Sequence, residues 1–284
     1  KRVVDDLHDP TRAFGFFTFT AATNVVSAMF VGIGLELPAA VLLAAAIAAW
    51  VVMGYSIPWL AVLSNPRRPI LEAANGTWFI WVVASQSIAV VAAGIEPLYP
   101  EARQWLAIIA VTTWSMGVML YAMCGLLLLF RLIMYRLEPQ QLDPPYWITM
   151  GAMAITVVAG ARIVEMDDAP MIDVTRALIA GLSVIFWAFA TWLIPALLAA
   201  GVWRHVVKRV PFRYQPTLWS FVFPMGMYAA ASIYLGRANR LPVVEAVGEI
   251  WFWAALLAWS ITAVGMVFDI GGRLSAWRNT KETV

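Results

Sequence analysis

Residues 219–232, Trp-Ser-Phe-Val-Phe-Pro-Met-Gly-Met-Tyr-Ala-Ala-Ala-Ser, lie within an uncharged run, Leu218–Leu235, that is long enough to cross a bilayer. Pro224 removes one backbone hydrogen bond from a helix and crowds the carbonyl four residues earlier, so the sequence predicts a kink at Phe223-Pro224. Membrane helices tolerate such a break because neighbouring helices satisfy the freed carbonyl. The small residues from Gly226 onward let other helices approach closely. A bulky aromatic at a kink, followed by little bulk, suits a plug in a narrow conduit.

The composition is that of a membrane protein. Hydrophobic residues make up 62% of the 284 residues and charged residues 13%, with a mean hydropathy of +0.77. An ordinary soluble domain carries about twice that share of charge. Cys124 is the only cysteine, which excludes an internal disulfide and a cysteine metal site. The net charge of +2 indicates nothing about partners, but no charge run is long enough to suggest a nucleic-acid patch, so no nucleic-acid partner is expected. We therefore expect an all-α polytopic membrane protein.

Eight hydrophobic spans joined by short connections are expected, as one transmembrane domain over residues 1–284. Shorter spans that hold polar residues alternate with longer, smoother ones rich in Leu, Ala and Ile. The alternation predicts four repeated helical hairpins, with an inner ring of short kinked helices and an outer, lipid-facing ring of long helices. The spans are Phe14–Gly32, Leu37–Leu63, Thr77–Ile95, Gln104–Leu132, Tyr146–Ile163, Ala177–Val202, Leu218–Leu235 and Val247–Ile270.

Aromatic residues mark the starts of the short spans. Phe16, Trp78, Trp147 and Trp219 recur at a spacing of roughly 60–70 residues. Membrane proteins built from repeats commonly place the substrate path where the repeats meet. The alternative interpretation is that the alternation in span length is accidental.

The basic residues predict the orientation. Of the 19 Lys and Arg residues, fourteen lie on the side of both termini and five on the opposite side, where loops such as 165–168 are acidic. Cytoplasmic loops carry an excess of Lys and Arg, so we expect a multi-pass plasma-membrane protein with cytoplasmic N- and C-termini. The short loops favour a prokaryotic inner membrane.

The chain lacks the residues that several classes of membrane protein require. His8 and His205 lie in or near loops, away from the depth at which haem ligands are required. Lys1, Lys208 and Lys281 lie outside the spans, which excludes a retinal Schiff base. No glycine-rich phosphate-binding loop of the G-x-x-x-x-G-K type occurs. We expect no enzyme activity and no catalytic, cofactor-binding or metal-binding residue.

Ionisable residues are scarce along the expected path. Glu249, Asp269 and Arg162 fall at span ends and are interpreted as interface residues. What remains is a path lined by hydroxyls, amides, small residues and aromatics. A neutral path of this kind passes anions without holding them, although this argument alone selects no ion.

Four segments, in order, resemble motifs of the tellurite-resistance / C4-dicarboxylate transporter family, whose plant members are the slow-type guard-cell anion channels. They are Asp9-Pro-Thr-Arg-Ala-Phe-Gly-Phe-Phe-Thr-Phe, Asn75-Gly-Thr-Trp-Phe-Ile-Trp-Val-Val-Ala-Ser-Gln86-Ser, Tyr146-Trp-Ile-Thr-Met-Gly151-Ala-Met-Ala-Ile155 and Trp219-Ser-Phe-Val-Phe223-Pro224-Met225. The resemblance covers essentially the whole chain. It implies a fold of ten helices in five hairpins around a central pore, in trimers with one pore per subunit. The first hairpin is then absent here, so we expect an N-terminally truncated chain in which Phe14–Gly32 corresponds to the third helix.

The resemblance also implies a gate. In that family the phenylalanine before the proline of the ninth helix closes the pore, and the matching residue here is Phe223. Stacking the short helices by their aromatic starts places further residues along the same pore. This register puts Thr20, Val82 and Gly151 at the level of Phe223, and Asn24, Gln86, Ile155 and Met227 one turn later; Pro224 is also predicted to line the pore. The alternative is that Phe223 is a packed aromatic beside a kink.

The leading hypothesis is therefore a homotrimer in the lipid bilayer that conducts small anions past Phe223. Chloride, nitrate, sulfite, tellurite and C4-dicarboxylates such as malate are the candidate substrates. The alternative is a proton-coupled dicarboxylate or oxyanion transporter, which needs Glu249 or Asp269 to face the path. A third hypothesis is a membrane scaffold that transports nothing.

Overall fold

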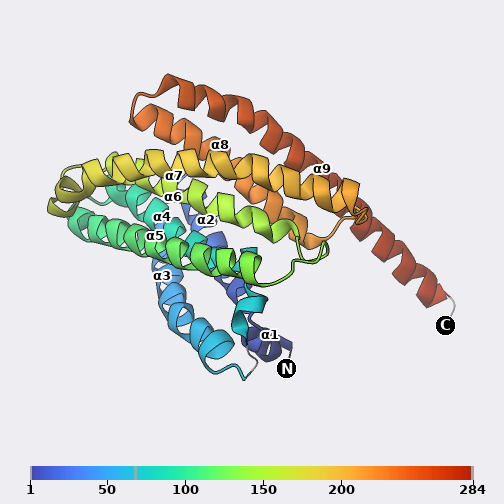
Figure 1. Ribbon diagram of the computed structural model, residues 1–284. Coiled ribbons are helices and arrows are strands. Elements are labelled where there is room, and N and C mark those ends of the chain that lie inside the picture. Colours follow the sequence, from blue (N-terminus) through green and yellow to red (C-terminus); the bar gives the residue numbers. More distant parts are fainter. Residues whose placement is uncertain (1, 67–68, 283–284) are drawn as a thin grey trace.

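The computed structural model describes residues 2–66 and 69–282, with side chains for residues 3–66 and 69–273. These residues form a helical bundle in which eight helices are long and apolar enough to cross a membrane, which confirms the predicted fold class (Figure 1). The helices are α1 (Arg2–His8), α2 (Thr18–Gly32), α3 (Glu36–Pro58), α4 (Ile80–Ile95), α5 (Arg103–Met134), α6 (Ile148–Val164), α7 (Pro170–Val202), α8 (Trp219–Ala238) and α9 (Pro242–Glu282).

Four helices form an inner row. α2 packs against α4, α4 against α6, and α6 against α8, and each is also paired with the helix that follows it in the chain. The spans of α4 and α6 are 78% and 83% buried and those of α2 and α8 are 28% and 44% buried, whereas no outer helix exceeds 22%. The predicted hairpins, with short helices inside and long helices outside, are therefore present. α2 and α8 lie at the two ends of the row and are less covered than the helices between them.

The outer helices are longer than the sequence predicts. The inner spans measure 20–23 residues and the outer ones 28–38. α7 begins at Pro170 instead of Ala177, and α9 begins at Pro242 instead of Val247. Proline suits the first helical position because the N–H groups of the first turn have no intrahelical partner. Hydropathy detects only the apolar part of such a helix, so the predicted spans start too late.

A 3-10 helix precedes each inner helix. These are η1 (Ala13–Phe17), η4 (Gly76–Phe79), η7 (Pro144–Trp147) and η9 (Pro216–Leu218). Each contacts the next in this order, and we call the four together the collar. The predicted aromatic starts lie in the collar or directly after it, so they mark equivalent positions in the four hairpins.

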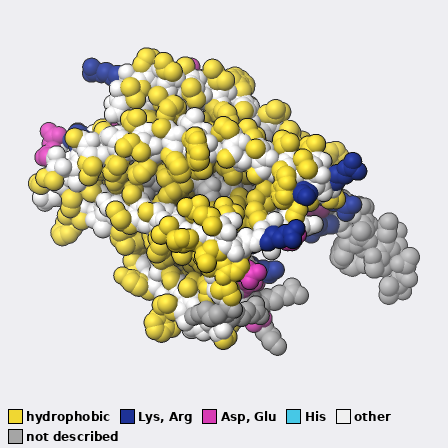
Figure 2. Space-filling view, in the orientation of Figure 1, with side chains coloured by type: hydrophobic (Ala, Val, Ile, Leu, Met, Phe, Trp, Pro, Cys, Tyr) yellow, Lys and Arg dark blue, Asp and Glu magenta, His cyan; other side chains and the backbone are white. Residues whose placement is uncertain are grey.

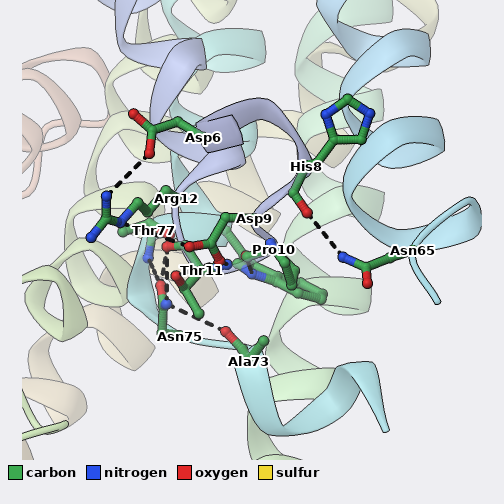
Figure 3. A network of polar contacts seen from close by, with 11 residues as sticks. Asp6, His8, Asp9, Pro10, Thr11, Arg12, Asn65, Ala73, Asn75 and Thr77 are labelled. Carbon is green, nitrogen blue, oxygen red and sulfur yellow. Dashed lines mark hydrogen bonds and ion pairs between the residues drawn. The ribbon is translucent and has the colours of Figure 1, made fainter. Parts of the chain in front are cut away.

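Polar contacts fix the segment before η1 to the second part of the collar (Figure 3). The indole Nε1 of Trp78 donates to the carbonyl of Pro10 at 2.8 Å, and the hydroxyl of Thr77 donates to the carbonyl of Thr11 at 3.2 Å. The carboxylate of Asp9 accepts bonds from the backbone N–H and the hydroxyl of Thr11 at 2.9 and 2.7 Å. The first two sequence motifs are thus joined side by side.

Gly76 brings the second and third motifs together. A Cβ on Gly76 would lie 1.9 Å from the carbonyl oxygen of Pro145 and 2.6 Å from the backbone nitrogen of Tyr146. Only a residue without a side chain permits this approach of two backbones. The collar therefore depends on backbone contact as well as on aromatic side chains.

A second repeat lies just outside the collar. In the first three hairpins, a side chain at the end of the outer helix donates a hydrogen bond to a backbone carbonyl before the inner helix. The three bonds join Asn65 to His8, Arg131 to Glu72 and Arg204 to Leu142. We call them the straps. They hold the two helices of each hairpin together at the end where the inner helix begins.

Charged side chains gather at the ends of the bundle and hydrophobic side chains cover most of the surface between them (Figure 2). The basic end is the end where the inner helices begin, with Arg12, Arg131, Arg204 and Arg213. The acidic end is the end where they finish, with Glu96, Asp167 and Asp168. Exposed apolar residues such as Met119, Ile185 and Phe252 on outer helices fit contact with lipid.

Candidate functional site

α8 approaches α6 closely at the proline of the sequence motif. A Cβ on Gly151 would lie 2.7 Å from Cγ and 3.1 Å from Cα of Pro224. The proline ring fits against α6 because residue 151 has no side chain. Pro224 is the sixth residue of α8, past the first turn, so its missing N–H leaves the carbonyl of Ser220 without its helical donor. The structure thus places Gly151 against Pro224, the residue that follows Phe223.

Phe223 and Met227 lie on one face of α8. Both are half-buried and pack against the hydrophobic cluster that contains Val82 of α4 and Ile155 of α6. The next residue, Tyr228, is 1% exposed and belongs to a different cluster beside α7. Three of the predicted lining residues, Val82, Ile155 and Met227, and the predicted gate Phe223 therefore meet in one cluster. Phe223 is therefore less buried than a core residue such as Tyr228.

Thr20 and Asn24 are buried in α2, and Asn24 makes a polar contact with α4. They are 0% and 1% exposed, and the amide nitrogen of Asn24 donates to the hydroxyl of Ser87 at 2.9 Å. Among the described residues, Oγ1 of Thr20 and Oδ1 of Asn24 have no hydrogen-bond partner. Asn24 thus pairs with the residue after the predicted Gln86, a shift of one position in the register.

Gln86 is directed away from α2. Its amide nitrogen donates to the carbonyl of Trp114 in α5 at 3.1 Å. A Cβ on Gly117 of α5 would lie 2.3 Å from that nitrogen, so the side chain fills a notch in the outer helix. This placement gives no support to the pore-lining role predicted for Gln86.

The inner helices carry no carboxylate. Within α2, α4, α6 and α8 the only charged residues are Arg162 and Arg237. Arg162 Nη2 donates to the hydroxyl of Tyr234 at 2.9 Å, and its guanidinium lies 4.3 Å from the centroid of that ring. Arg162 also lies 3.7 Å from Glu165, so it takes part in an exposed ion pair.

Arg162 and Tyr234 continue the contact between α6 and α8. Arg162 follows Ile155 by seven residues, and Tyr234 follows Met227 by seven, which places each pair on one face of its helix. The place of Arg162 near a span end predicts an interface residue, whereas its seven-residue spacing from Ile155 puts it in line with the predicted path.

Residues 1–267 match the family model described as voltage-dependent anion channel, SLAC1. The chain belongs to this family. Anion transport across a membrane is thus the general function that its fold serves. The family is one of channels and transporters, in agreement with the expectation that the chain is not an enzyme.

Two sets of relatives agree with this anion channel family. An uncharacterized membrane protein of Mycobacterium tuberculosis is 56% identical over 155 residues, which are 55% of this chain and 79% of the relative. Two uncharacterized transporters of Methanocaldococcus jannaschii are 26% and 25% identical over 195 residues, which are 68% of this chain and 55% and 56% of the relatives. No solved structure matches the chain.

The two acidic residues that proton coupling would need lie on the outermost helix of this channel-family protein. Glu249 is exposed on α9, and Asp269 forms an ion pair with Arg273 at 2.9 Å on the same helix. Neither belongs to the inner row. Among the described residues, no group of three or more His, Cys, Asp or Glu side chains is arranged to hold a metal ion.

Proposed function

We propose that the protein conducts small anions along the inner row and that Phe223 closes this path. The observation that carries the proposal is the position of Phe223. It precedes the proline that packs on Gly151, it is half-buried, and it faces the cluster of Val82 and Ile155. A half-buried ring of this kind can rotate out of a narrow passage without unfolding α8.

The chemistry of the inner row supports an anion over a cation. A cation path is commonly lined by acidic side chains, whereas α2, α4, α6 and α8 contain none. All four begin at the basic end, so the partial positive charges of their N-termini lie at the same mouth. Val82, Gly151, Ile155 and Met227 offer no fixed charge that would trap an ion. Chloride, nitrate, sulfite, tellurite and C4-dicarboxylates such as malate remain the candidate substrates.

The orientation and assembly belong to the same proposal. The basic end faces the cytoplasm, with both chain termini there, because Lys and Arg are enriched in cytoplasmic loops. The membrane is then a prokaryotic inner membrane, and the assembly is a homotrimer. Labelling of single cysteines in intact cells and light scattering of the detergent-solubilised protein test these two statements.

The proton-coupled alternative has less support. It needs a titrating carboxylate on the path, and Glu249 and Asp269 both lie on α9. The proton-coupled alternative would regain support from one result. Transport by wild type would depend on a pH gradient, and a Glu249→Gln, Asp269→Asn double variant would lose this dependence. The scaffold alternative requires no anion flux at all.

The deciding experiment measures anion flux into liposomes that carry the purified protein. We compare wild type with Phe223→Ala and with Phe252→Ala, which removes an exposed ring from outer helix α9. Phe223→Ala is expected to raise the flux at least about tenfold, and Phe252→Ala to leave it unchanged. Equal fluxes in the three proteins, at equal amounts of folded protein, would remove Phe223 from the role of gate.

A further inference from the structure

A cavity of about 490 Å³ lies at the basic end, outside the inner row. Its walls come from the ends of α7 and α8, from η7 and from α9. Most of its lining side chains are apolar, among them Leu197, Phe221 and Ile261. The polar groups of the lining include Arg204, His205 and Asp143. The cavity is thus apolar along most of its wall and carries charge at the basic end of the bundle.

Arg204 differs from the equivalent arginine of the preceding hairpin. Arg131 donates from Nε to Glu72, from Nη1 to Tyr135 and from Nη2 to Gln141, so all three nitrogens are engaged. Arg204 makes the same strap through Nη1, but its Nε has no partner among the described residues although the residue is only 7% exposed. A buried guanidinium with an unused donor is costly unless a ligand completes it.

α7 is followed by a π-helical turn, η8 (Trp203–Val207), which carries both Arg204 and His205. A turn of the same kind, η2 (Trp59–Leu63), follows α3, so it recurs at the ends of two outer helices. In η8 it sets the positions of Arg204 and His205 at the cavity. The following loop adds the exposed Lys208 and Arg209. They follow the cavity lining in sequence, and the lining itself holds the guanidinium of Arg204 and the carboxylate of Asp143.

We propose that this cavity binds an anionic phospholipid from the leaflet at the basic end. An acyl chain lies along the apolar wall of Leu197, Phe221 and Ile261, and the phosphate accepts from the guanidinium of Arg204, which lines the cavity. Guanidinium groups bind phosphate well because their planar donors match its oxygens. Basic groups near the membrane surface also attract anionic lipids at about 1 kcal/mol each.

Two other occupants fit less well. A zwitterionic phospholipid brings a cationic group toward Lys208 and Arg209, which opposes its binding. Free phosphate supplies the anion but leaves the apolar wall uncovered. The site therefore predicts a preference for phosphatidylglycerol over both phosphatidylcholine and inorganic phosphate.

The test is native mass spectrometry of the detergent-solubilised protein during titration with phosphatidylglycerol or phosphatidylcholine. Wild type is expected to retain phosphatidylglycerol at least about tenfold better. Arg204→Gln loses that preference, Arg204→Lys keeps part of it, and Arg213→Gln, which removes an exposed charge outside the cavity lining, keeps all of it. Equal binding of the two lipids by wild type would overturn the proposal. So would displacement of phosphatidylglycerol by millimolar inorganic phosphate.

A second pair of variants covers the case in which Arg204→Gln fails to fold because its strap is lost. Gly201 lines the cavity, and a Cβ there meets nothing within 4 Å; Gly181, on the same helix, also has open space but lies outside the lining. Gly201→Phe fills the cavity and is expected to abolish retention of phosphatidylglycerol. Gly181→Phe is expected to bind as wild type does. Unchanged lipid binding in a folded Gly201→Phe protein would refute the site.

Discussion

The ring of Pro224 lies against the bare backbone of Gly151, and a methyl group on residue 151 would come within 2.7 Å of it. This contact sets the distance between α6 and α8 at the level of Phe223. The register of the candidate gate thus depends on one missing side chain. A change at Gly151 is therefore expected to affect both the packing of α6 against α8 and the position of the proposed gate.

Gly151→Ala is therefore expected to destabilise the protein and to change anion flux together. The added methyl meets a rigid ring that cannot rotate away, and overpacking of this kind typically costs about 1–3 kcal/mol. The matched control is Gly226→Ala on α8, where a Cβ meets nothing within 4 Å. Thermal unfolding in detergent, with flux measured in parallel, checks both effects. Equal melting temperatures for the two variants would show that α6 and α8 are not held together at this point.

Gly76→Ala is expected to be more damaging than Gly151→Ala. The new Cβ would lie 1.9 Å from a backbone carbonyl oxygen, that of Pro145, so only movement of the collar relieves the clash. We expect a loss of more than about 3 kcal/mol, at the upper end of overpacking effects, seen as poor yield and early aggregation. Gly94→Ala in α4 is the control because its Cβ meets nothing within 4 Å. A monodisperse Gly76→Ala protein with wild-type melting temperature would contradict the close approach.

The hairpins and the two layers of helices can be predicted from the sequence because they depend on the length and polarity of each span. Both are properties of a whole span and do not require the direction of any single side chain. The sequence motifs predict Gly151 at the level of Phe223, and in the structure Gly151 packs against the next residue, Pro224. The direction of the Gln86 side chain could not be predicted in this way. Its direction is decided by the notch at Gly117, thirty-one residues away, which no helical period reveals. The strap hydrogen bonds could not be predicted for the same reason, because each joins a side chain to a backbone carbonyl far away in the sequence.

Stability is expected to depend on pH through Asp143. Burial raises the pKa of this carboxyl from 3.8 to about 6, and the charge of Arg204 offsets part of that rise. A raised pKa means that the folded protein binds the proton more tightly than the unfolded chain. The contribution is thus full below about pH 4 and is lost as the pH rises through about 6. Melting temperatures of wild type and Asp143→Asn are compared between pH 4 and 7.5. The difference between them should change across this window, and a constant difference would place the carboxyl in water.

Arg162 is expected to concentrate anions at the acidic end of the path. Its guanidinium lies over the ring of Tyr234, in line with Ile155 and Met227, so a positive charge stands where an anion enters from that side. Arg162→Gln should reduce flux from that side several-fold at low ionic strength, and the deficit should shrink in high salt because screening weakens steering. Tyr234→Phe keeps the ring but loses the hydrogen bond, so it should have a smaller effect. Arg240→Gln removes a charge at the same end outside this line and serves as the control. If it reduced flux as much as Arg162→Gln does, the effect would come from surface charge in general and not from the place of Arg162 on the path.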